Sequence, residues 1–363
     1  MAGKAGLKRK TLSFAAALAG LVLATALVSW FGFHRVLAGV IKVGIGGLLL
    51  LVLCQGALFV ILGFAWWTLM PKRPGVRVLI WARMVRDAAA NCLPLSTVGG
   101  FVLGARAATL HGVAWQMASA STVADITSEF LTQLVFAAGG LGVLMVLNPG
   151  NHLVLPFGIG IGFGLLGGGA FIAAQRGMAP FARRLGRYLN ARWITATIAR
   201  VELLQGELTP IYRRPGRYSA ASALHLLGWI ASGAGGWLIM RLAGASIGLP
   251  AALAIEGLLQ VSLTVAFAVP GFAGVQEAAY VGLGSAFGLT PDIAIAVSLV
   301  RRARDVLVGV PILLVWQFIE ARRLRPAEDR DVSPGHRSPP LPRGDFKGSA
   351  LGAGSGEVEP PLP

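Results

Sequence analysis

Two carboxylates lie deep within an apolar stretch of this sequence. Asp125 and Glu129 are one helical turn apart, in a predicted helix that begins near Ala114. A rise of about 1.5 Å per residue places Asp125 roughly 16 Å into a membrane. Charges at that depth cost on the order of several kcal/mol unless they face water, a proton or a cation. The same helix face carries Ser121, Thr122, Ser128, Thr132 and Gln133.

Three arginines and an acid occupy the last apolar stretch, at Arg301, Arg302, Arg304 and Asp305. They lie about 14 to 20 Å from its start, too central for all three guanidinium groups to reach the surface. We expect Arg301 to pair with Asp305, or with Asp125 and Glu129. Either arrangement leaves at least one guanidinium for a phosphate or carboxylate head group. A purely structural ion pair is the alternative, but it accommodates three arginines poorly.

The segment Val269–Glu277 combines a helix break with a new helix start. Pro270 ends the preceding helix, Gly271 and Gly274 permit an open turn, and a helix begins near Val275. Its free amide hydrogens attract an anionic group, and Gln276 lies beside them. Alternatively, Glu277 satisfies those amides itself as a capping acid.

A second break at Leu93–Pro94 predicts a similar opening earlier in the chain. It is formed by Asn91, Ser96, Thr97, Gly99 and Gly100, and Arg106 lies on the helix that follows. The expected binding or translocation residues are therefore Asp125, Glu129, Arg106, Arg301, Arg302, Arg304, Asp305, Gln276 and Glu277. The expected helix-break or gating residues are Pro94, Gly99, Gly100, Pro270, Gly271 and Gly274.

The composition excludes an ordinary soluble protein. Of 363 residues, 55% are hydrophobic and 13% charged, against roughly 25% charged in soluble domains. The net charge of +16 would suggest nucleic acid on a soluble chain, but here it lies between apolar runs. Cys54 and Cys92 support neither a disulfide framework nor a metal cluster. No hydrolase or transferase motif is present, so we expect no cofactor and no metal.

Hydropathy predicts six spans separated by two broken apolar stretches. The spans are Leu12–Phe33, Gly44–Leu69, Met117–Leu147, Leu153–Ala174, Tyr218–Met240 and Asp292–Phe318. The broken stretches are Val76–Leu110 and Pro250–Leu289. If each is a re-entrant hairpin, all the basic segments fall on one side of the membrane.

Basic residues set the predicted orientation. They concentrate in Met1–Lys10, Pro71–Asn91, Gln175–Arg217 and Ala321–Arg325, whereas the opposite loops hold only Arg35, Lys42 and Arg241. The positive-inside rule therefore predicts cytoplasmic N- and C-termini. Because the run behind Lys10 is too long for a cleaved signal peptide, we expect it to remain as the first span.

The two broken stretches align when the sequence is shifted by 176 residues. Leu93–Pro94 falls on Val269–Pro270, and Gly112 falls on Gly288. The same shift places Asp125 opposite Arg301 and Glu129 opposite Asp305. The predicted fold class is an all-α polytopic membrane protein with two inverted repeats, each with three spans and one re-entrant helical hairpin. Chance matching is the alternative, because glycine and alanine are abundant.

Three regions follow from these patterns. Residues 1–10 form a basic cytoplasmic N-terminus, and residues 11–320 form the transmembrane domain, with repeat halves at about 11–147 and 152–320. Within it, the loop 175–217 has apolar residues at helical spacing among arginines, which is typical of a helix on an anionic leaflet. A solvated basic loop is the alternative. Residues 321–363 form a Pro/Gly-rich tail that is predicted to be disordered.

These motifs resemble a known membrane family. The break at 93–100, the motif Pro270-Gly271-x-x-Gly274-x-x-Glu277 and the arginines of the last span resemble the flippase-type transmembrane domain of lysylphosphatidylglycerol synthases. Within that family, residues 23–32 and 100–106 resemble the subgroup associated with hopanoid biosynthesis. This chain has Phe272 where members commonly have glycine. The synthases' soluble aminoacyl-transfer domain is absent, so the resemblance implies lipid translocation rather than lipid aminoacylation.

The favoured function is an inner-membrane lipid flippase or transporter that handles anionic phospholipids or hopanoids. In this hypothesis the acids and arginines line a polar path, which the hairpins at Pro94 and Pro270 open alternately. A membrane enzyme that modifies lipid head groups is one alternative. The other is a non-catalytic organiser that docks lipid-synthesis enzymes on its basic face.

Overall fold

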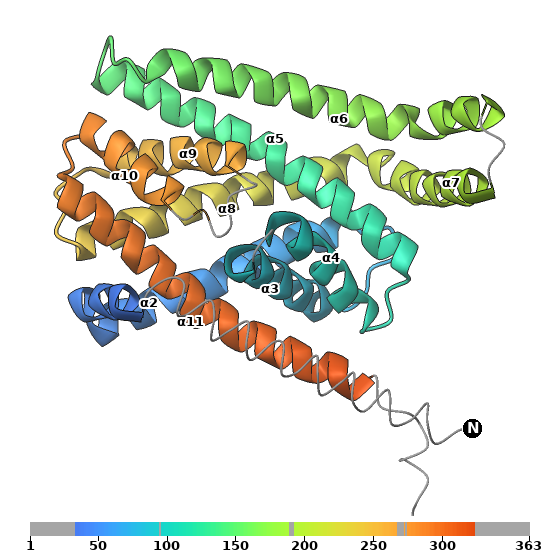
Figure 1. Ribbon diagram of the computed structural model, residues 1–363, viewed down its shortest axis with the longest axis horizontal. Helices are drawn as coiled ribbons and strands as arrows, with labels where there is room; N and C mark the ends of the chain where they lie inside the picture. The colour runs from blue at the N-terminus through green and yellow to red at the C-terminus, as the bar shows by residue number, and fades with distance from the viewer. Residues whose placement is uncertain (1–32, 94–95, 189–191, 267–271, 273, 324–363) are drawn as a thin grey trace, which may run out of the picture. The chain divides into compact units, whose positions relative to one another are not determined.

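The described part of the protein is all-helical. The computed structural model describes residues 33–93, 96–188, 192–266, 272 and 274–323, and these residues contain ten α-helices and no strand (Figure 1). The helices are α2 Phe33–Leu69, α3 Val76–Cys92, α4 Ser96–Thr109, α5 Trp115–Leu147, α6 Val154–Tyr188, α7 Arg192–Tyr212, α8 Pro215–Leu242, α9 Leu249–Val265, α10 Val275–Ala286 and α11 Pro291–Arg323.

Four helices are long and apolar enough to cross a membrane, which makes this a multi-pass membrane protein. The apolar segments are Val43–Leu69, Trp115–Leu147, Val154–Gln175 and Pro215–Leu242. Large apolar side chains point outward on them; Ile45 is 77% exposed and Val146 is 78% exposed. Such exposure suits contact with lipid rather than with water. These segments match four of the six predicted spans.

The other two predicted spans differ from these four. Leu12–Phe33 lies outside the described residues except for Phe33. Asp292–Phe318 is covered by the single helix α11, whose central charges distinguish it from the apolar spans. Residues 34–43 were expected to form a loop, but they form the first part of α2. A kink at Gly44, which has a φ of 74°, separates this part from the rest of the helix.

Both broken stretches form pairs of shorter helices. α3 packs against α4, and α9 packs against α10. Gly100 and Gly104 allow the close approach of α4 to α3, because a Cβ at Gly100 would lie 2.6 Å from the Arg86 carbonyl oxygen. The predicted breaks at Pro94, Pro270 and Gly271 lie outside the described residues.

The same turn recurs 176 residues later in the chain. Gly112 follows α4 with a φ of 91°, and Gly288 follows α10 with a φ of 81°. The amide of Val113 donates to the Ala108 carbonyl, just as Leu289 donates to Gly284. This pattern closes a helix with glycine in the left-handed conformation. The next helices, α5 and α11, also begin and end 176 residues apart.

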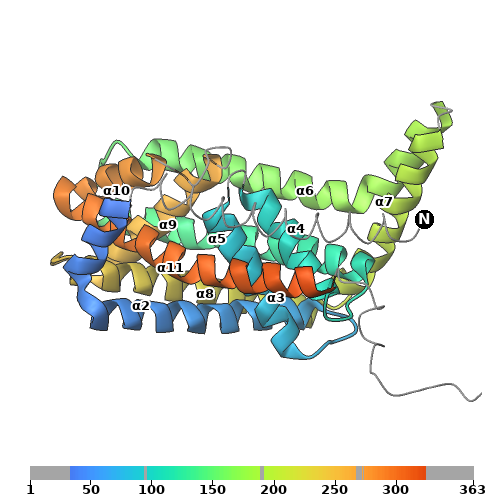
Figure 2. The same ribbon diagram turned by 60° about the horizontal axis from the view of Figure 1, so that its bottom comes forward.

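The basic segment between the third and fourth apolar spans is helical. α6 continues past its apolar part to Tyr188, and α7 follows, at a steep angle to α6 in Figure 2. Leu208 and Ile211 of α7 are buried against Ala120, Ala124 and Ala221. The last part of α7 is therefore packed against α5 and α8.

Candidate functional site

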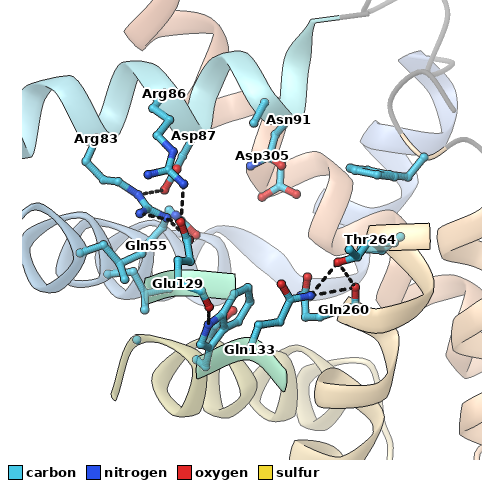
Figure 3. Close-up of a pocket in the computed structure, with 18 of the residues that line it drawn as sticks. Gln55, Arg83, Arg86, Asp87, Asn91, Glu129, Gln133, Gln260, Thr264 and Asp305 are labelled. Carbon is cyan, nitrogen blue, oxygen red and sulfur yellow. Dashed lines mark hydrogen bonds and ion pairs between the residues drawn. The ribbon is translucent and has the colours of Figure 1, made fainter. Parts of the chain in front are cut away.

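A cavity of about 340 Å³ lies among helices from both halves of the chain (Figure 3). Its apolar walls include Leu58, Phe101, Phe130 and Trp229. Its polar lining residues are Gln55, Arg83, Arg86, Asp87, Asn91, Glu129, Gln133, Ser232, Gln260, Thr264, Gln276, Arg301, Arg304 and Asp305. A mostly apolar cavity with convergent charged groups is the usual form of a ligand site.

The wall formed by α3 and α5 contains a network of ion pairs, which we name the arginine–carboxylate cluster. It consists of Arg83, Arg86, Asp87, Asp125 and Glu129. Arg86 Nη1 lies 2.5 Å from Asp125 Oδ2, and its Nη2 also pairs with Glu129. Arg83 lies 2.6 Å from Glu129 and 2.8 Å from Asp87. Figure 3 shows both arginines extending from α3 toward Glu129.

Helical spacing creates this cluster. Arg83, Arg86 and Asp87 are at positions i, i+3 and i+4 on one face of α3, and Asp125 and Glu129 are one turn apart on α5. The arginine side chains are 4% and 5% exposed. Removing one partner from such a network would leave a buried charge without compensation.

The basic segment Pro71–Asn91 is not a surface loop throughout. Residues 76–91 belong to α3, and Arg83 and Arg86 are buried rather than on a loop surface. The reason is that the acids of α5 supply their counter-charges.

Behind the cluster lies a histidine that the sequence analysis missed. His225 Nε2 of α8 is 2.9 Å from Asp125 Oδ1, and both side chains are 0% exposed. One turn later, Trp229 donates to the backbone carbonyl of Glu129 across 3.2 Å. A histidine and a tryptophan at positions i and i+4 within an apolar span were a sequence signal for this contact.

The opposite part of the site centres on Arg301 and another missed residue, Glu256. Arg301 Nη1 lies 2.5 Å from Glu256 Oε2. The Tyr280 hydroxyl donates to Glu256 across 2.6 Å and accepts from Arg301 across 3.0 Å. Gly236 makes room for this group, because a Cβ there would overlap the Glu256 carboxylate.

The start of α10 is capped by its own acid. The Gly274 amide donates to Glu277 Oε2 across 2.9 Å, which corresponds to the capping alternative. Glu277 also pairs with Arg302 at 2.8 Å, and Gln276 donates to Ser298 Oγ across 2.8 Å. Glu277 thus links the start of α10 to α11.

The expected pairings of the last-span arginines are wrong. Arg301 pairs with Glu256 rather than with Asp305, Asp125 or Glu129. Arg304 pairs with Asp305 at 2.7 Å. Arg301, Arg302 and Arg304 thus each have a carboxylate partner, so the expected free guanidinium is not observed.

The remaining candidates lie in different places. Arg106 is 2.7 Å from Glu320, is 42% exposed and does not line the cavity. Gly99 and Gly100 lie in α4, where Gly100 is buried against α3. Among the described residues, no group of three or more metal-ligating side chains occurs, and Cys54 and Cys92 are not bonded to each other.

The fold and the cavity place this protein in the class of multi-pass helical membrane proteins that hold paired charges among their helices. The family described as the lysylphosphatidylglycerol synthase TM region matches residues 17–312, more than half of the chain. The chain belongs to this family of membrane proteins, which suggests a role in lipid modification or flipping. A comparison with curated proteins gave no match.

Proposed function

We propose that this protein is a flippase that moves the head groups of polar lipids across the bacterial inner membrane. The observation that carries the proposal is the cavity of about 340 Å³ with charged walls inside a bundle whose outer surface is apolar. Such a volume suits a head group rather than a whole lipid. The acyl chains would therefore stay in the bilayer while the head group crosses.

The cavity lining supplies both signs of charge for this task. Arg83, Arg86, Arg301 and Arg304 can contact a phosphate, at the expense of their present carboxylate partners. Because these arginines are already paired, an incoming anion exchanges one partner for another. It does not have to enter an unbalanced positive site.

Two inverted halves with re-entrant hairpins form the gating part of the proposal. The turn at Gly112 and Gly288 and the matching bounds of α5 and α11 support a repeat. In this scheme α3–α4 and α9–α10 enter from opposite sides and open the cavity alternately. Cysteine-accessibility mapping at Gly99 and Gly274 tests it, because re-entrant hairpins expose these two positions to opposite sides.

Cytoplasmic termini complete the proposed topology. Arg214 donates to the Pro71 carbonyl and Arg217 to the Met70 carbonyl. The basic segments that follow α2 and α7 therefore meet at one end of the bundle, as the positive-inside rule requires of a cytoplasmic face.

Reconstitution tests the proposed transport. We expect the purified protein in phosphatidylcholine vesicles to move fluorescent phosphatidylglycerol between leaflets. Arg301→Gln should slow this movement about tenfold or more, because it removes a cavity-lining guanidinium that can contact the head group and takes away the ion-pair partner of Glu256. Arg241→Gln, at an exposed site in α8, is the matched control and should behave like the wild type.

Two outcomes would refute the flippase. One is that the wild type moves no labelled lipid; the other is that it changes the mass of the lipid, which would indicate an enzyme. The hopanoid proposal needs a further comparison with a labelled polar hopanoid in the same vesicles. It fails if phosphatidylglycerol moves and the hopanoid does not.

A further inference from the structure

The arginine–carboxylate cluster does not balance its own charges. Arg83 and Arg86 face three carboxylates, those of Asp87, Asp125 and Glu129. Asp87 and Glu129 line the cavity and are 18% and 15% exposed, whereas Asp125 is 0% exposed, so Asp125 is the carboxylate whose charge water does not screen. A buried net charge is strongly unfavourable, so the cluster requires one further positive group.

His225 is the imidazole that faces the cluster from α8. Its Nε2 lies 2.9 Å from Asp125 Oδ1, and the imidazole is fully buried. Its Nδ1 is buried and has no hydrogen-bond partner among the described residues. His225 and Asp125 lie behind the cavity wall, whereas the other four members of the cluster line the cavity.

The other elements around the cluster do not supply the missing charge. α2 contributes Gln55 and the indole of Trp66, and α4 places Phe101 against Arg86. α11 contributes Arg304 and Asp305, which pair with each other. Tyr218, which is also near Asp125, contributes a phenol. Within the described residues, the His225–Asp125 pair is therefore the most deeply buried place at which one proton balances the cluster.

We propose that His225 and Asp125 form a proton-binding site and that an anionic head group at Arg83 and Arg86 binds together with this proton. The proton site rests on the geometry alone, whereas its role in transport rests on the proposed function. An anion at the cavity wall adds negative charge next to Asp125, so it favours the protonated imidazole. By linkage, the bound proton favours the anion equally.

Histidine NMR tests the proton site without transport. The full chain with His34, His111, His152 and His336 replaced by glutamine retains His225 as its only imidazole. With ¹⁵N-labelled histidine in detergent micelles, we expect both ring nitrogens to be protonated at pH 7. Asp125→Asn in this background leaves two arginines and two carboxylates, so the imidazole should become neutral. A neutral His225 in the parent protein overturns the proposal.

The same sample tests the link to an anionic lipid. A short-chain phosphatidylglycerol should increase the protonated fraction of His225 at alkaline pH, whereas short-chain phosphatidylcholine should leave it unchanged. Equal effects of the two lipids, or no effect of either, overturn the coupling. This readout does not depend on lipid movement.

Vesicle transport then tests the role of the site in the proposed function. Wild-type movement of phosphatidylglycerol should speed up about tenfold when one side is acidified from pH 8 to pH 6, and His225→Gln should remove this dependence. His152→Gln, at an exposed site after α5, is the control that should keep it. Unchanged pH dependence in His225→Gln overturns the coupling.

Two further results distinguish a wrong inference from other causes of a negative result. These causes are a variant that does not fold and a protein that is not a flippase. His225→Gln leaves the cluster one negative charge in excess, so it can misfold. The double variant Asp125→Asn/His225→Gln is balanced and should recover thermal stability without a pH response. If no variant moves lipid while His225 is protonated and responds to phosphatidylglycerol, the flippase proposal fails and the proton site stands.

Discussion

The two halves of the molecule share a backbone pattern but use their charges differently. In the first half, three acids and two arginines converge in one cluster, which His225 of the second half contacts from behind. In the second half, the charges separate into three pairs, Arg301–Glu256, Arg302–Glu277 and Arg304–Asp305. The first arrangement has one carboxylate more than it has arginines, whereas the second is neutral pair by pair. The shared turn and helix bounds therefore do not imply shared chemistry.

The largest difference between the halves should appear when one arginine is removed from the first. Arg86→Leu leaves Arg83 as the only arginine facing the three carboxylates of the cluster, and the fully buried Asp125 keeps only Arg83 at 3.5 Å and His225. We therefore expect a loss of about 3–5 kcal/mol in the free energy of unfolding. Urea unfolding in detergent micelles measures it. Asp125→Asn in the same chain should recover a large part of the loss, and Arg241→Leu should cost little. A loss of less than about 1 kcal/mol would show that Asp125 does not depend on Arg86.

The equivalent change in the second half should cost less. In Arg301→Leu, Glu256 keeps its hydrogen bond from Tyr280, and the Arg301 side chain is 13% exposed rather than fully buried. We expect a loss of about 2 kcal/mol in the same unfolding assay. Adding Tyr280→Phe should increase the loss, because Glu256 then has neither partner. A loss as large as that of Arg86→Leu would contradict the contrast between cluster and pair.

Neighbouring glycines on α8 test whether Glu256 needs the space it occupies. A Cβ at Gly236 would overlap the Glu256 carboxylate, whereas a Cβ at Gly235 meets nothing within 4 Å. We expect Gly236→Ala to destabilise the protein by about 1–3 kcal/mol and Gly235→Ala to be neutral or stabilising by up to about 1 kcal/mol. Thermal unfolding of the two variants measures the difference. Equal effects would mean that Glu256 moves away from α8 without loss.

The helices and the deep acids were predictable from the sequence because they depend on local patterns. Apolar runs predicted the four long spans, and proline and glycine placed the breaks close to the observed helix ends. Depth in an apolar helix was enough to identify Asp125 and Glu129, which lie in a buried ion-pair network. The same argument would have identified Glu256, a lone acid in an apolar stretch.

The partners of these acids were not predictable, because pairing depends on which helix faces meet. Arg83 and Arg86 follow a basic loop in the sequence, so the charge pattern assigned them to the membrane surface. Their position became clear only when α3 was placed against α5. Arg106 shows the opposite error. Because it follows the polar break closely in the sequence, it was expected at the site, but it pairs with Glu320 and does not line the cavity.

The smallest loss of stability is expected for alanine at the two matching turn glycines. It should be equal in the two halves, because it depends only on the backbone turn that they share. Gly112 and Gly288 both have positive φ, and a Cβ at either would meet nothing within 4 Å. Alanine at each site therefore adds only the strain of the left-handed conformation, about 1 kcal/mol. Equal losses for Gly112→Ala and Gly288→Ala in thermal unfolding would show that the turn is energetically the same in both halves. Losses that differ by more than about 1 kcal/mol would show that the shared geometry serves a different purpose in each half, as the charges do.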